Sequence, residues 1–391
     1  MNESNSDEKF LRHALELARQ SIGLASPNPY VGAVIVDAHG AIVGSGTHTY
    51  QIVKHAEVLA LEQACERARG GTLYINLEPC SHVGRTGPCA DAVIAAGIRR
   101  VVASMTDPNP LVSGRGFEKL RSAGVEVEVG LLQNEARRLN EAFARYIRST
   151  RPLVTLKSAM TLDGKIAPPP RKAHIGSAHN LPAGFSGTWI TGETARAHAH
   201  ELRHQHDAIL VGIGTVLADN PALTDRSGRP RRRPLLRIVL DSKLRLPLES
   251  QLVRSAAQSG NGNLLVFASS PDSDRKAKLE NRGVCVEMLP STADGGLEFA
   301  AILRRLRELE ITSVMIEGGS RVNAAALGSG LVDKVFFYYA PRILGESDAI
   351  PLVAEEAKAR VSAIMQVRSV SLHRFGEDFA IEGYLRDPYA D

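Results

Sequence analysis

The chain has 391 residues, of which 43% are hydrophobic and 23% are charged, a composition typical of a globular protein with two or three domains. Its four cysteines are too few for a disulfide framework, and we find neither a secretory leader nor an apolar run of about eighteen residues. The net charge of +4 is too small to indicate nucleic acid as a partner, although it would suit small anionic substrates. We therefore expect a cytoplasmic protein that binds neither membranes nor nucleic acid.

The first part of the chain alternates helical and extended patterns, which favours an α/β layer fold. Apolar residues at helical spacing predict a helix over residues 7–21, and Ala38-His39-Gly40 joins two short strand patterns into a hairpin. Further helices are expected at 55–69, 88–96 and 133–148, and further strands at 72–77 and 99–105. Residues 149–152 are the expected boundary, so the first domain would cover residues 1–149.

The most informative stretch begins at His55-Ala-Glu57 and continues in Pro79-Cys80 and Cys89. One imidazole and two thiolates can fill three corners of a tetrahedral zinc site and leave the fourth to a water, as in catalytic zinc sites. Glu57 would then act as the general acid and base and not as a ligand, which is the zinc-deaminase pattern. Activated water in such a site attacks an amidine-like ring carbon, and ammonia leaves. A structural zinc site or a pair of buried thiols is the simpler alternative.

The spacing of the two cysteines separates this chain from deaminases that act on nucleic acid. Those enzymes use a short Pro-Cys-x-x-Cys motif, whereas residues 81–88 lie between Cys80 and Cys89 here. The intervening His82 and Arg85 could reach the ring and the phosphate of a small substrate from beside the metal.

Beyond the boundary, continuous apolar strand patterns recur, which is typical of a sheet covered on both faces. Strands are expected at 153–157, 208–212, 237–241, 264–268, 313–317 and 334–340, and helices at 193–204 and 297–309. The last two strand patterns, 367–373 and 379–385, have no long helix between them, which predicts an antiparallel pair at the sheet edge. The second domain would span residues 150–391.

Three strand ends in this half carry polar or glycine-rich motifs. Lys157 ends the first strand pattern, Gly212-Ile-Gly214-Thr215 follows another, and Glu317-Gly-Gly319 follows a third and opens a helix. Glycines at strand ends before helices let phosphates approach backbone amides. Because neither motif is a full Gly-x-Gly-x-x-Gly fingerprint, the spacing alone predicts a nucleotide site of unspecified kind. The basic stretch 229–234 is expected to be a solvated loop and not a phosphate clamp.

Taken together, these motifs resemble the bifunctional deaminase/reductase family of bacterial riboflavin biosynthesis. In the first half they are His55-Ala-Glu57, Pro79-Cys-Ser-His-x-Gly-Arg-Thr-x-Pro-Cys89, Pro27-Asn-Pro29 and Asp107-Pro-Asn-Pro110. In the second half they are Leu156-Lys-Ser-Ala-Met-Thr-Leu-Asp-Gly-Lys165, Trp189-Ile-Thr191, Val211-Gly-Ile-Gly-Thr-Val-Leu-Ala-Asp-Asn-Pro-x-Leu-Thr224 and Ile316-Glu-Gly-Gly319. The resemblance covers nearly the whole chain. It implies a cytidine-deaminase-like three-layer α/β domain followed by a dihydrofolate-reductase-like α/β domain.

The resemblance also implies two reactions with zinc and NADPH as cofactors. The family's deaminase converts 2,5-diamino-6-(5-phosphoribosylamino)pyrimidin-4-one to the corresponding uracil, and its reductase turns the ribosyl group of that product into a ribityl chain. The zinc ligands would be His55, Cys80 and Cys89, and the catalytic residues Glu57, Lys157 and Asp219, the last two as proton handlers. The residues that would hold the first substrate are Asn28, His48, His82 and Arg85. Those near NADPH would be Ala159, Trp189, Thr215, Asp219 and Gly319, and those near the second substrate Arg203, Leu223, Arg226 and Glu317.

Several of these residues have simpler interpretations. Asn28 between two prolines suits any turn, His48 near a strand end could be solvent-exposed, and Lys157 could be a snorkelling lysine. Cys65 and Cys285 lie in apolar patterns, and we expect both in the core.

One stretch departs from the family. Residues 168–188, between Ala167 and Trp189, form a longer loop than is usual, and Gly187 stands where a substrate-binding serine is expected. Ser186 is adjacent and could substitute after a shift of one residue. This departure leaves the activity of the reductase half open.

Two rival functions remain at this point. The first is a nucleic-acid-editing deaminase with an accessory domain, against which the long inter-cysteine loop and the near-neutral charge argue. The second is a zinc-stabilised module that senses a nucleotide, in which Glu57→Gln would leave function intact. The favoured hypothesis predicts small phosphorylated pyrimidines as substrates, and we expect a homo-oligomer, either a dimer or a tetramer.

Overall fold

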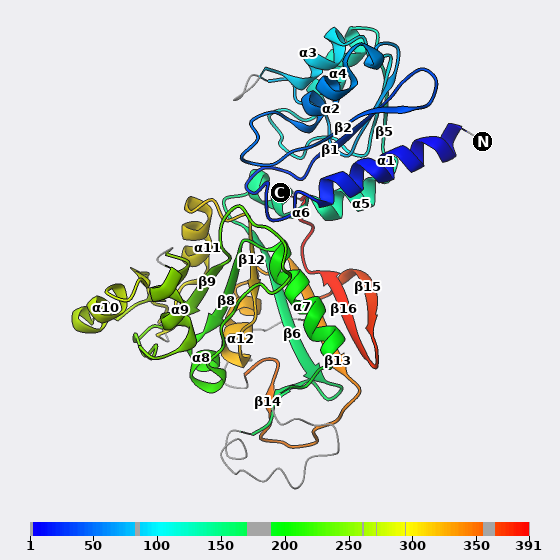
Figure 1. Ribbon diagram of the computed structural model, residues 1–391. Coiled ribbons are helices and arrows are strands. Elements are labelled where there is room, and N and C mark those ends of the chain that lie inside the picture. The colour runs from blue at the N-terminus through cyan, green and yellow to red at the C-terminus, as the bar shows by residue number, and fades with distance from the viewer. Residues whose placement is uncertain are drawn as a thin grey trace. The chain divides into compact units, whose positions relative to one another are not determined.

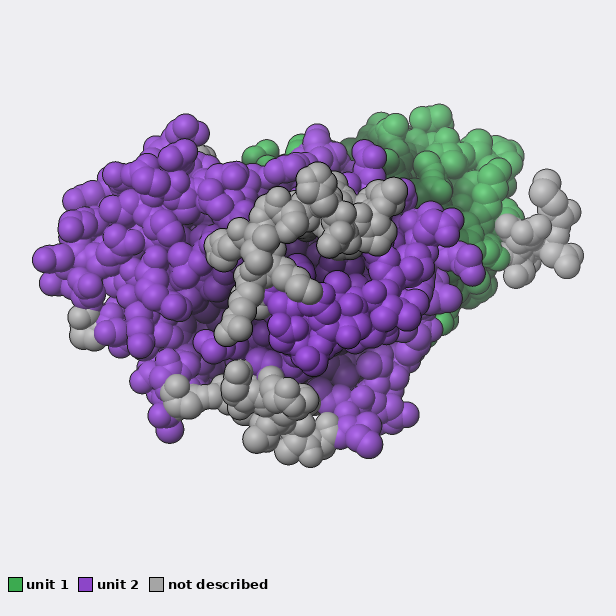
Figure 2. Space-filling model, turned by 90° about the horizontal axis from the view of Figure 1, so that it is seen from below, with its two compact units in different colours: residues 1–150, 230–233, 388–391 green, residues 151–229, 234–387 purple. Residues whose placement is uncertain are grey.

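The computed structural model describes residues 3–82, 87–169, 189–259, 262–270, 272–293, 295–354 and 364–390. The chain divides into two compact units, which are coloured separately in Figure 2. Unit 1 holds residues 1–150, 230–233 and 388–391, and unit 2 holds residues 151–229 and 234–387. The two short segments of unit 1 come from the half of the chain that the sequence assigns to the second domain. Among the described residues, no helix is long and apolar enough to cross a membrane.

Unit 1 is built on a five-stranded sheet in the order β2-β1-β3-β4-β5 (Figure 1). Its strands are β1 (Gly32–Val36), β2 (Ile42–Thr47), β3 (Thr72–Ile75), β4 (Arg100–Ala103) and β5 (Glu126–Val129). Its helices are α1 (Glu3–Arg19), α2 (Ala56–Ala64), α3 (Cys89–Ala95), α4 (Arg115–Ser122), α5 (Gln133–Leu139) and α6 (Glu141–Arg148), and a 3-10 turn, Cys65–Ala68, follows α2. β1 pairs antiparallel with β2 and β3, which confirms the predicted hairpin, and β3, β4 and β5 run parallel.

Side chains of this sheet alternate between two buried layers. Val34, Tyr74 and Val102 pack against α1, while Ile35 and Leu73 pack with α2, α3 and α4 on the other face. Because helices cover both faces, unit 1 has the predicted three-layer α/β arrangement.

Unit 2 contains a nine-stranded sheet in the order β11-β10-β9-β8-β12-β6-β13-β16-β15 (Figure 1). Its strands are β6 (Leu153–Thr161), β8 (Ala208–Gly212), β9 (Leu236–Leu240), β10 (Leu264–Ala268), β11 (Cys285–Met288), β12 (Ser313–Ile316), β13 (Lys334–Ala340), β15 (Arg368–Phe375) and β16 (Asp378–Tyr384). The strands from β11 to β13 are parallel, whereas β16 and β15 complete the edge as the predicted antiparallel pair. A separate two-stranded sheet joins β7 (Lys165–Ala167) to β14 (Ile350–Pro351).

Helices cover both faces of the large sheet. They are α7 (Glu193–Gln205), α8 (Ile213–Asp219), α9 (Gln251–Ser259), α10 (Ser273–Glu280), α11 (Phe299–Glu308) and α12 (Ser320–Gly328). Buried residues of α7 to α10 pack with Val211 and Val239, and those of α11 and α12 pack with Leu210 and Ile238. This alternation confirms the prediction of a sheet that is buried on both sides.

Two local predictions of secondary structure are wrong. The single helix expected over 133–148 is broken at Asn140, where the backbone leaves helical geometry with φ −104° and ψ 16°. The Asn140 side chain bonds both the N–H and the carbonyl of Tyr30, which holds the break in place. Lys157 does not end its strand, because β6 continues to Thr161 in register with β13.

The two cysteines expected in the core are both exposed. Cys65 follows the last residue of α2 with a positive φ of 51°, so the helical face that would have buried it has already ended. Cys285 lies on β11, the outermost strand of its sheet, where one side remains open to solvent.

Candidate functional site

Three predicted zinc ligands converge in unit 1 from separate elements. His55 immediately precedes α2, Cys89 is the first residue of α3, and Cys80 lies in the loop after β3. Their ligand atoms all lie within 4.8 Å of one another. His55 Nδ1 is 3.2 Å from the Cys89 sulfur and 3.5 Å from the Cys80 sulfur. Such separations suit three ligands of one tetrahedral ion, whose metal–ligand distances are about 2.0–2.3 Å.

The electrostatics of this cluster also fit zinc. The backbone N–H of Cys89 donates to the Cys80 sulfur at 3.3 Å. A hydrogen bond with the Cys89 thiol, supported by His55, lowers the pKa of Cys80 and favours the thiolate that binds the metal. The donor set is therefore suited to a zinc ion.

Glu57 lies beside these ligands in a dry environment. Glu57 is only 3% exposed, and burial raises the pKa of its carboxyl to about 7. Its Oε2 is buried without a hydrogen-bond partner in the described part of the chain. A buried carboxylate oxygen without a partner is costly, so this atom is poised to exchange a proton with a molecule bound at the site.

Two of the predicted substrate residues meet next to His55. Asn28 Nδ2 is 3.0 Å from His48 Nε2, and the His48 and His55 rings are 5.3 Å apart between centroids. His48 is 5% exposed, and burial lowers its pKa, so the interpretation of a solvent-exposed histidine is wrong. His82 is exposed on the loop after Cys80, and Arg85 falls outside the described residues.

Glu78 is a residue that the sequence analysis missed. Its buried carboxylate accepts backbone N–H bonds from Asp107 at 3.0 Å, Gly114 at 2.9 Å, Gly116 at 2.7 Å and Phe117 at 3.4 Å. It thereby fixes the Asp107-Pro-Asn-Pro110 loop to the strand end that leads to Cys80. A charged residue directly after a buried strand and before Pro-Cys was the available signal.

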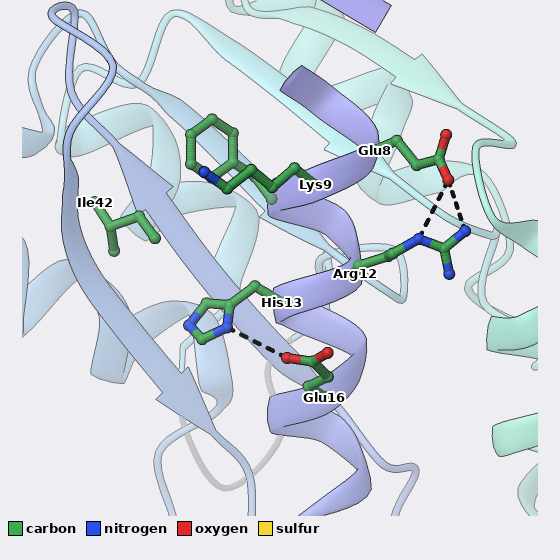
Figure 3. Close-up of a pocket in the computed structure, with 7 residues that line it drawn as sticks. Glu8, Lys9, Arg12, His13, Glu16 and Ile42 are labelled. Atoms are coloured by element: carbon green, nitrogen blue, oxygen red, sulfur yellow. Dashed lines mark hydrogen bonds and ion pairs between the residues drawn. The ribbon is translucent and has the colours of Figure 1, made fainter. Parts of the chain in front are cut away.

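A surface groove elsewhere on unit 1 contains none of the predicted site residues. It runs along α1 and is lined by Glu8, Lys9, Phe10, Arg12, His13, Glu16 and Ile42 (Figure 3). Glu8 pairs with Arg12 and His13 with Glu16 along the same helix. These groups therefore satisfy one another and do not converge on a reacting centre.

In unit 2, strand register brings Lys157 and Glu317 together. Ile316 at the end of β12 pairs with Leu156 of β6, so the residues that follow lie side by side. Lys157 Nζ is 3.5 Å from Glu317 Oε2, and Arg203 of α7 donates to both Glu317 oxygens at 2.7 and 3.0 Å. Burial opposes ionisation of Glu317, but Lys157 and Arg203 lower its pKa to about 2. The carboxylate is therefore ionised and held mainly by the arginine.

Two of the residues predicted to bind NADPH, Thr215 and Gly319, follow the carboxyl ends of the neighbouring parallel strands β8 and β12. A Cβ added to Gly319 would lie 3.6 Å from the Thr215 hydroxyl, so the two motifs after β8 and β12 are adjacent. Gly319 immediately precedes α12 and no side chain caps that helix, which leaves backbone donors for a phosphate. These residues fit a dinucleotide.

The other predicted cofactor residues come from different elements. Ala159 lies on β6, two residues beyond Lys157, and Asp219 is the exposed last residue of α8. Trp189 is 56% exposed, with the Arg196 guanidinium 5.3 Å from its ring centre. Ser186, Gly187 and most of the 168–188 loop fall outside the described residues.

The remaining predicted substrate residues lie around one short segment after α8. Arg203 donates to the Thr224 carbonyl at 3.0 Å, and Arg226 Nε donates to the Thr224 hydroxyl at 3.3 Å. Leu223 is 4% exposed and has a positive φ of 51°. Arg203 thus connects Glu317 to this segment.

Comparison with known proteins identifies the family of the chain. Residues 4–105 match the family model of the cytidine and deoxycytidylate deaminase zinc-binding region, and residues 152–381 match that of the RibD C-terminal domain. Riboflavin biosynthesis protein RibD of Aquifex aeolicus is 41% identical over 375 residues, which cover 96% of this chain and 97% of that protein. The Escherichia coli protein is 37% identical over 96% of this chain and 98% of its own length. This chain belongs to the RibD family.

Solved RibD structures agree with the fold. The deaminase/reductase of Thermotoga maritima is 36% identical with a TM-score of 0.79, and the match covers 98% of this chain and 99% of that one. Acinetobacter baumannii RibD, form 1, is 31% identical with a TM-score of 0.78 and covers 97% of this chain and 99% of its own. The predicted resemblance, the two-part fold class and the bifunctional activity are therefore confirmed. The protein is a deaminase and a reductase of riboflavin biosynthesis, with zinc and NADPH as its cofactors.

Proposed function

We propose that unit 1 performs the deamination and unit 2 the reduction, with residues 1–149 and 150–391 as the two catalytic domains. The substrates are the phosphoribosylamino derivative of the diaminopyrimidinone and then that of aminouracil. The observation that carries the proposal is the convergence of His55, Cys80 and Cys89 beside the buried, unpartnered oxygen of Glu57.

In the deamination, zinc bound by His55, Cys80 and Cys89 would supply an activated water for attack on the ring carbon. Glu57 would accept one proton of that water and pass it to a ring nitrogen. It would then take the remaining proton from the hydroxyl group added to the ring carbon and deliver it to the amino group that leaves as ammonia. A pKa raised to about 7 by burial suits both directions of transfer near neutral pH.

The substrate of unit 1 would be oriented by residues on both sides of the metal ligands. Asn28 and His48, linked at 3.0 Å, offer an amide and a neutral imidazole to the pyrimidine. We assign the ring to His82 and the phosphate to Arg85, which both belong to the stretch between the two cysteines. These assignments explain why the loop between the cysteines is long.

In the reduction, NADPH would supply the hydride when held by Ala159, Trp189, Thr215, Asp219 and Gly319. Lys157 donates the proton that the ring oxygen of the ribose takes up when its bond to C1′ breaks. Because Arg203 binds both oxygens of Glu317, loss of that proton does not leave the buried carboxylate without a partner. Asp219 is the second proton handler, and Arg203, Leu223, Arg226 and Glu317 hold the substrate.

The test uses the purified protein with the diaminopyrimidine nucleotide, with and without NADPH, while pyrimidine absorbance and NADPH absorbance are followed separately. Glu57→Gln should abolish deamination, retain zinc by elemental analysis and leave reduction of the aminouracil unchanged. Lys157→Met should abolish the reduction and leave the deamination unchanged. Deamination without any NADPH oxidation in the unmodified protein would refute the reductase half of the proposal.

We also propose a cytoplasmic location and a homo-oligomeric state, a dimer or a tetramer. Four cysteines without a disulfide suit a reducing compartment. Light scattering coupled to size-exclusion chromatography would report the mass of the particle in solution. The mass of a single 42.1 kDa chain at micromolar concentration would contradict the proposed homo-oligomeric state.

A further inference from the structure

Consecutive residues of α7 hold consecutive residues of the segment that carries Leu223 and Arg226. Arg203 donates to the Thr224 carbonyl at 3.0 Å, and His204 Nδ1 is 2.9 Å from Asp225 Oδ2. Figure 1 shows α7 lying across the face of the sheet near β6 and β13. Ala195 and Leu202 of α7 belong to the cluster against which Ala159 of β6 packs, two residues beyond Lys157.

The contact between His204 and Asp225 is almost completely buried. The side chain of His204 is 1% exposed and that of Asp225 is 9% exposed. Asp225 also uses its second oxygen, which accepts the backbone N–H of Ser227 at 2.9 Å and closes a turn. The carboxylate therefore anchors the segment to α7 and fixes its direction after Arg226.

We propose that the His204–Asp225 pair is a positioning pair for the phosphorylated ribosylaminopyrimidine substrate of the reductase. The pair does not touch the substrate, and it acts through Leu223 and Arg226, whose placement it determines. This inference rests on the proposed function of those two residues. It adds a substrate-affinity determinant that lies outside the predicted site residues.

Loss of the His204–Asp225 pair should raise KM for the reductase substrate and leave the rate of the reduction almost unchanged. Without the pair, the segment 223–226 must be ordered when substrate binds, and that cost raises KM. Lys157 and Glu317 are placed by β6 and β12, so the rate of the reduction itself should change little. A lost hydrogen bond between a buried donor and a charged acceptor corresponds to about a tenfold or larger rise in KM.

The experiment compares Asp225→Ala, Asp225→Asn and His204→Gln in the full-length protein. Asp225→Ala and His204→Gln should each raise KM for the aminouracil substrate about tenfold, with kcat within about twofold. Asp225→Asn keeps an acceptor oxygen and should recover part of the affinity. The double variant His204→Gln/Asp225→Ala should be no worse than either single one, because both break the same bond.

His206 provides a matched control at the same end of α7. It is 7% exposed, and its ring is 2.7 Å from the Leu202 carbonyl and 2.9 Å from the Thr155 hydroxyl, both of which lie outside the segment 223–226. His206→Gln should lower the melting temperature as His204→Gln does, yet leave KM unchanged. Deamination and the Kd for NADPH, measured by fluorescence on the same preparations, should not change in any variant.

Two results would overturn the inference. One is an unchanged KM in Asp225→Ala and His204→Gln, and the other is an equal rise of KM in His206→Gln. If Arg226→Ala raises KM while the pair variants do not, only the inference is wrong. If Arg226→Ala also leaves KM unchanged, the substrate assignment of the segment fails and the inference falls with it. Should His204→Gln not fold, the Asp225 variants decide alone.

Discussion

Glu57 combines at one position the two properties that a proton carrier needs. Burial raises its pKa to about 7, and its Oε2 has no hydrogen-bond partner among the residues described. A group with this pKa can take up a proton and return it at neutral pH. Because the proposed metal ligands are other side chains, removal of this charge should separate proton transfer from metal binding.

Glu317 should make unit 2 sensitive to acid. Its pKa is lowered from 4.5 to about 2, against the effect of burial, by Lys157 and Arg203. The stabilisation is therefore fully present above pH 4.5 and is lost as the pH falls from 4.5 through about 2. Its upper limit is about 3 kcal/mol, the equivalent of that shift.

Glu317→Gln should remove this pH dependence. We expect a shallower decrease of the unfolding free energy between pH 4.5 and pH 2 than in the unmodified protein, measured by urea unfolding at each pH. The control is Glu298→Gln, which changes an exposed carboxylate whose ion-pair partner, Arg304, lies 3.8 Å away. This change should leave the slope unchanged. Parallel pH curves for Glu317→Gln and the unmodified protein would contradict the prediction.

Glu78 should be far more important for stability than a surface carboxylate. Glu78→Ala leaves four backbone donors without their acceptor, and we expect a loss of at least about 3 kcal/mol in the unfolding free energy. The control is Glu62→Ala, which breaks a 2.6 Å ion pair with Lys54 between half-exposed side chains and should cost less than about 1 kcal/mol. Chemical denaturation followed by circular dichroism distinguishes the two, and equal losses would argue against the anchoring role.

At the level of elements, the tight turn from β12 into α12 depends on a glycine. A Cβ at Gly318 would lie 2.7 Å from Val322 Cβ and 3.0 Å from the Asn323 amide oxygen, so α12 would have to shift. Gly318→Ala should therefore cost about 1–3 kcal/mol of stability. It should also weaken NADPH binding, because the adjacent Gly319 moves with the helix.

Gly214 offers the matched comparison for this prediction. A Cβ at Gly214 would meet no atom within 4 Å, so Gly214→Ala should change the unfolding free energy by less than about 0.5 kcal/mol. The melting temperature of both variants checks the effect on stability, and the Kd for NADPH is measured for Gly318→Ala. A Gly318→Ala protein with unchanged melting temperature would show that α12 tolerates the shift.

The strand β6 illustrates why element ends were harder to predict than element types. Its apolar run ends at Leu156, which suggested that Lys157 terminates the strand. Pairing with β13 instead continues to Thr161, since hydrogen bonds from a neighbouring strand extend β6 through Lys157 and Ser158. The periodicity of a sequence does not indicate which strand will pair with it in the sheet.

On the scale of the molecule, unit 1 includes pieces of chain from outside its own sequence range. In the segment 230–233, Arg232 donates its N–H to the Gly23 carbonyl at 2.8 Å and places its guanidinium 3.6 Å from the Tyr50 ring centre. The solvated loop expected over 229–234 is correct for Arg229, Pro230 and Pro234, which are exposed, and wrong for residues 231–233, which are half-buried. At the C-terminus, the Tyr389 hydroxyl donates to the Arg137 carbonyl at 2.9 Å.

A fragment of residues 1–149 should therefore be less stable than unit 1 within the whole chain. We expect a lower melting temperature for zinc-loaded fragment, because it lacks both 230–233 and 388–391. In the full chain, Arg232→Ala should cost about 0.5–2 kcal/mol through the lost contact with Tyr50. Calorimetry that found the fragment as stable as the whole chain would mean that these segments contribute nothing.

The sequence by itself predicted the chemistry of the deaminase centre and determined the layering of both sheets. His55, Cys80, Cys89 and Glu57 belong to residue types and spacings that few functions other than zinc catalysis require. Apolar periodicity predicted which elements are buried, because alternation reports directly on burial.

Only the tertiary structure decided which distant groups meet. The donors around Glu78, the break at Asn140 and the His204–Asp225 pair each join positions whose contact depends on how separate elements pack. A polar side chain has the same local sequence signature whether it faces water or a buried partner. Its role is therefore set by the free energy of satisfying that group in the folded chain, which no local pattern contains.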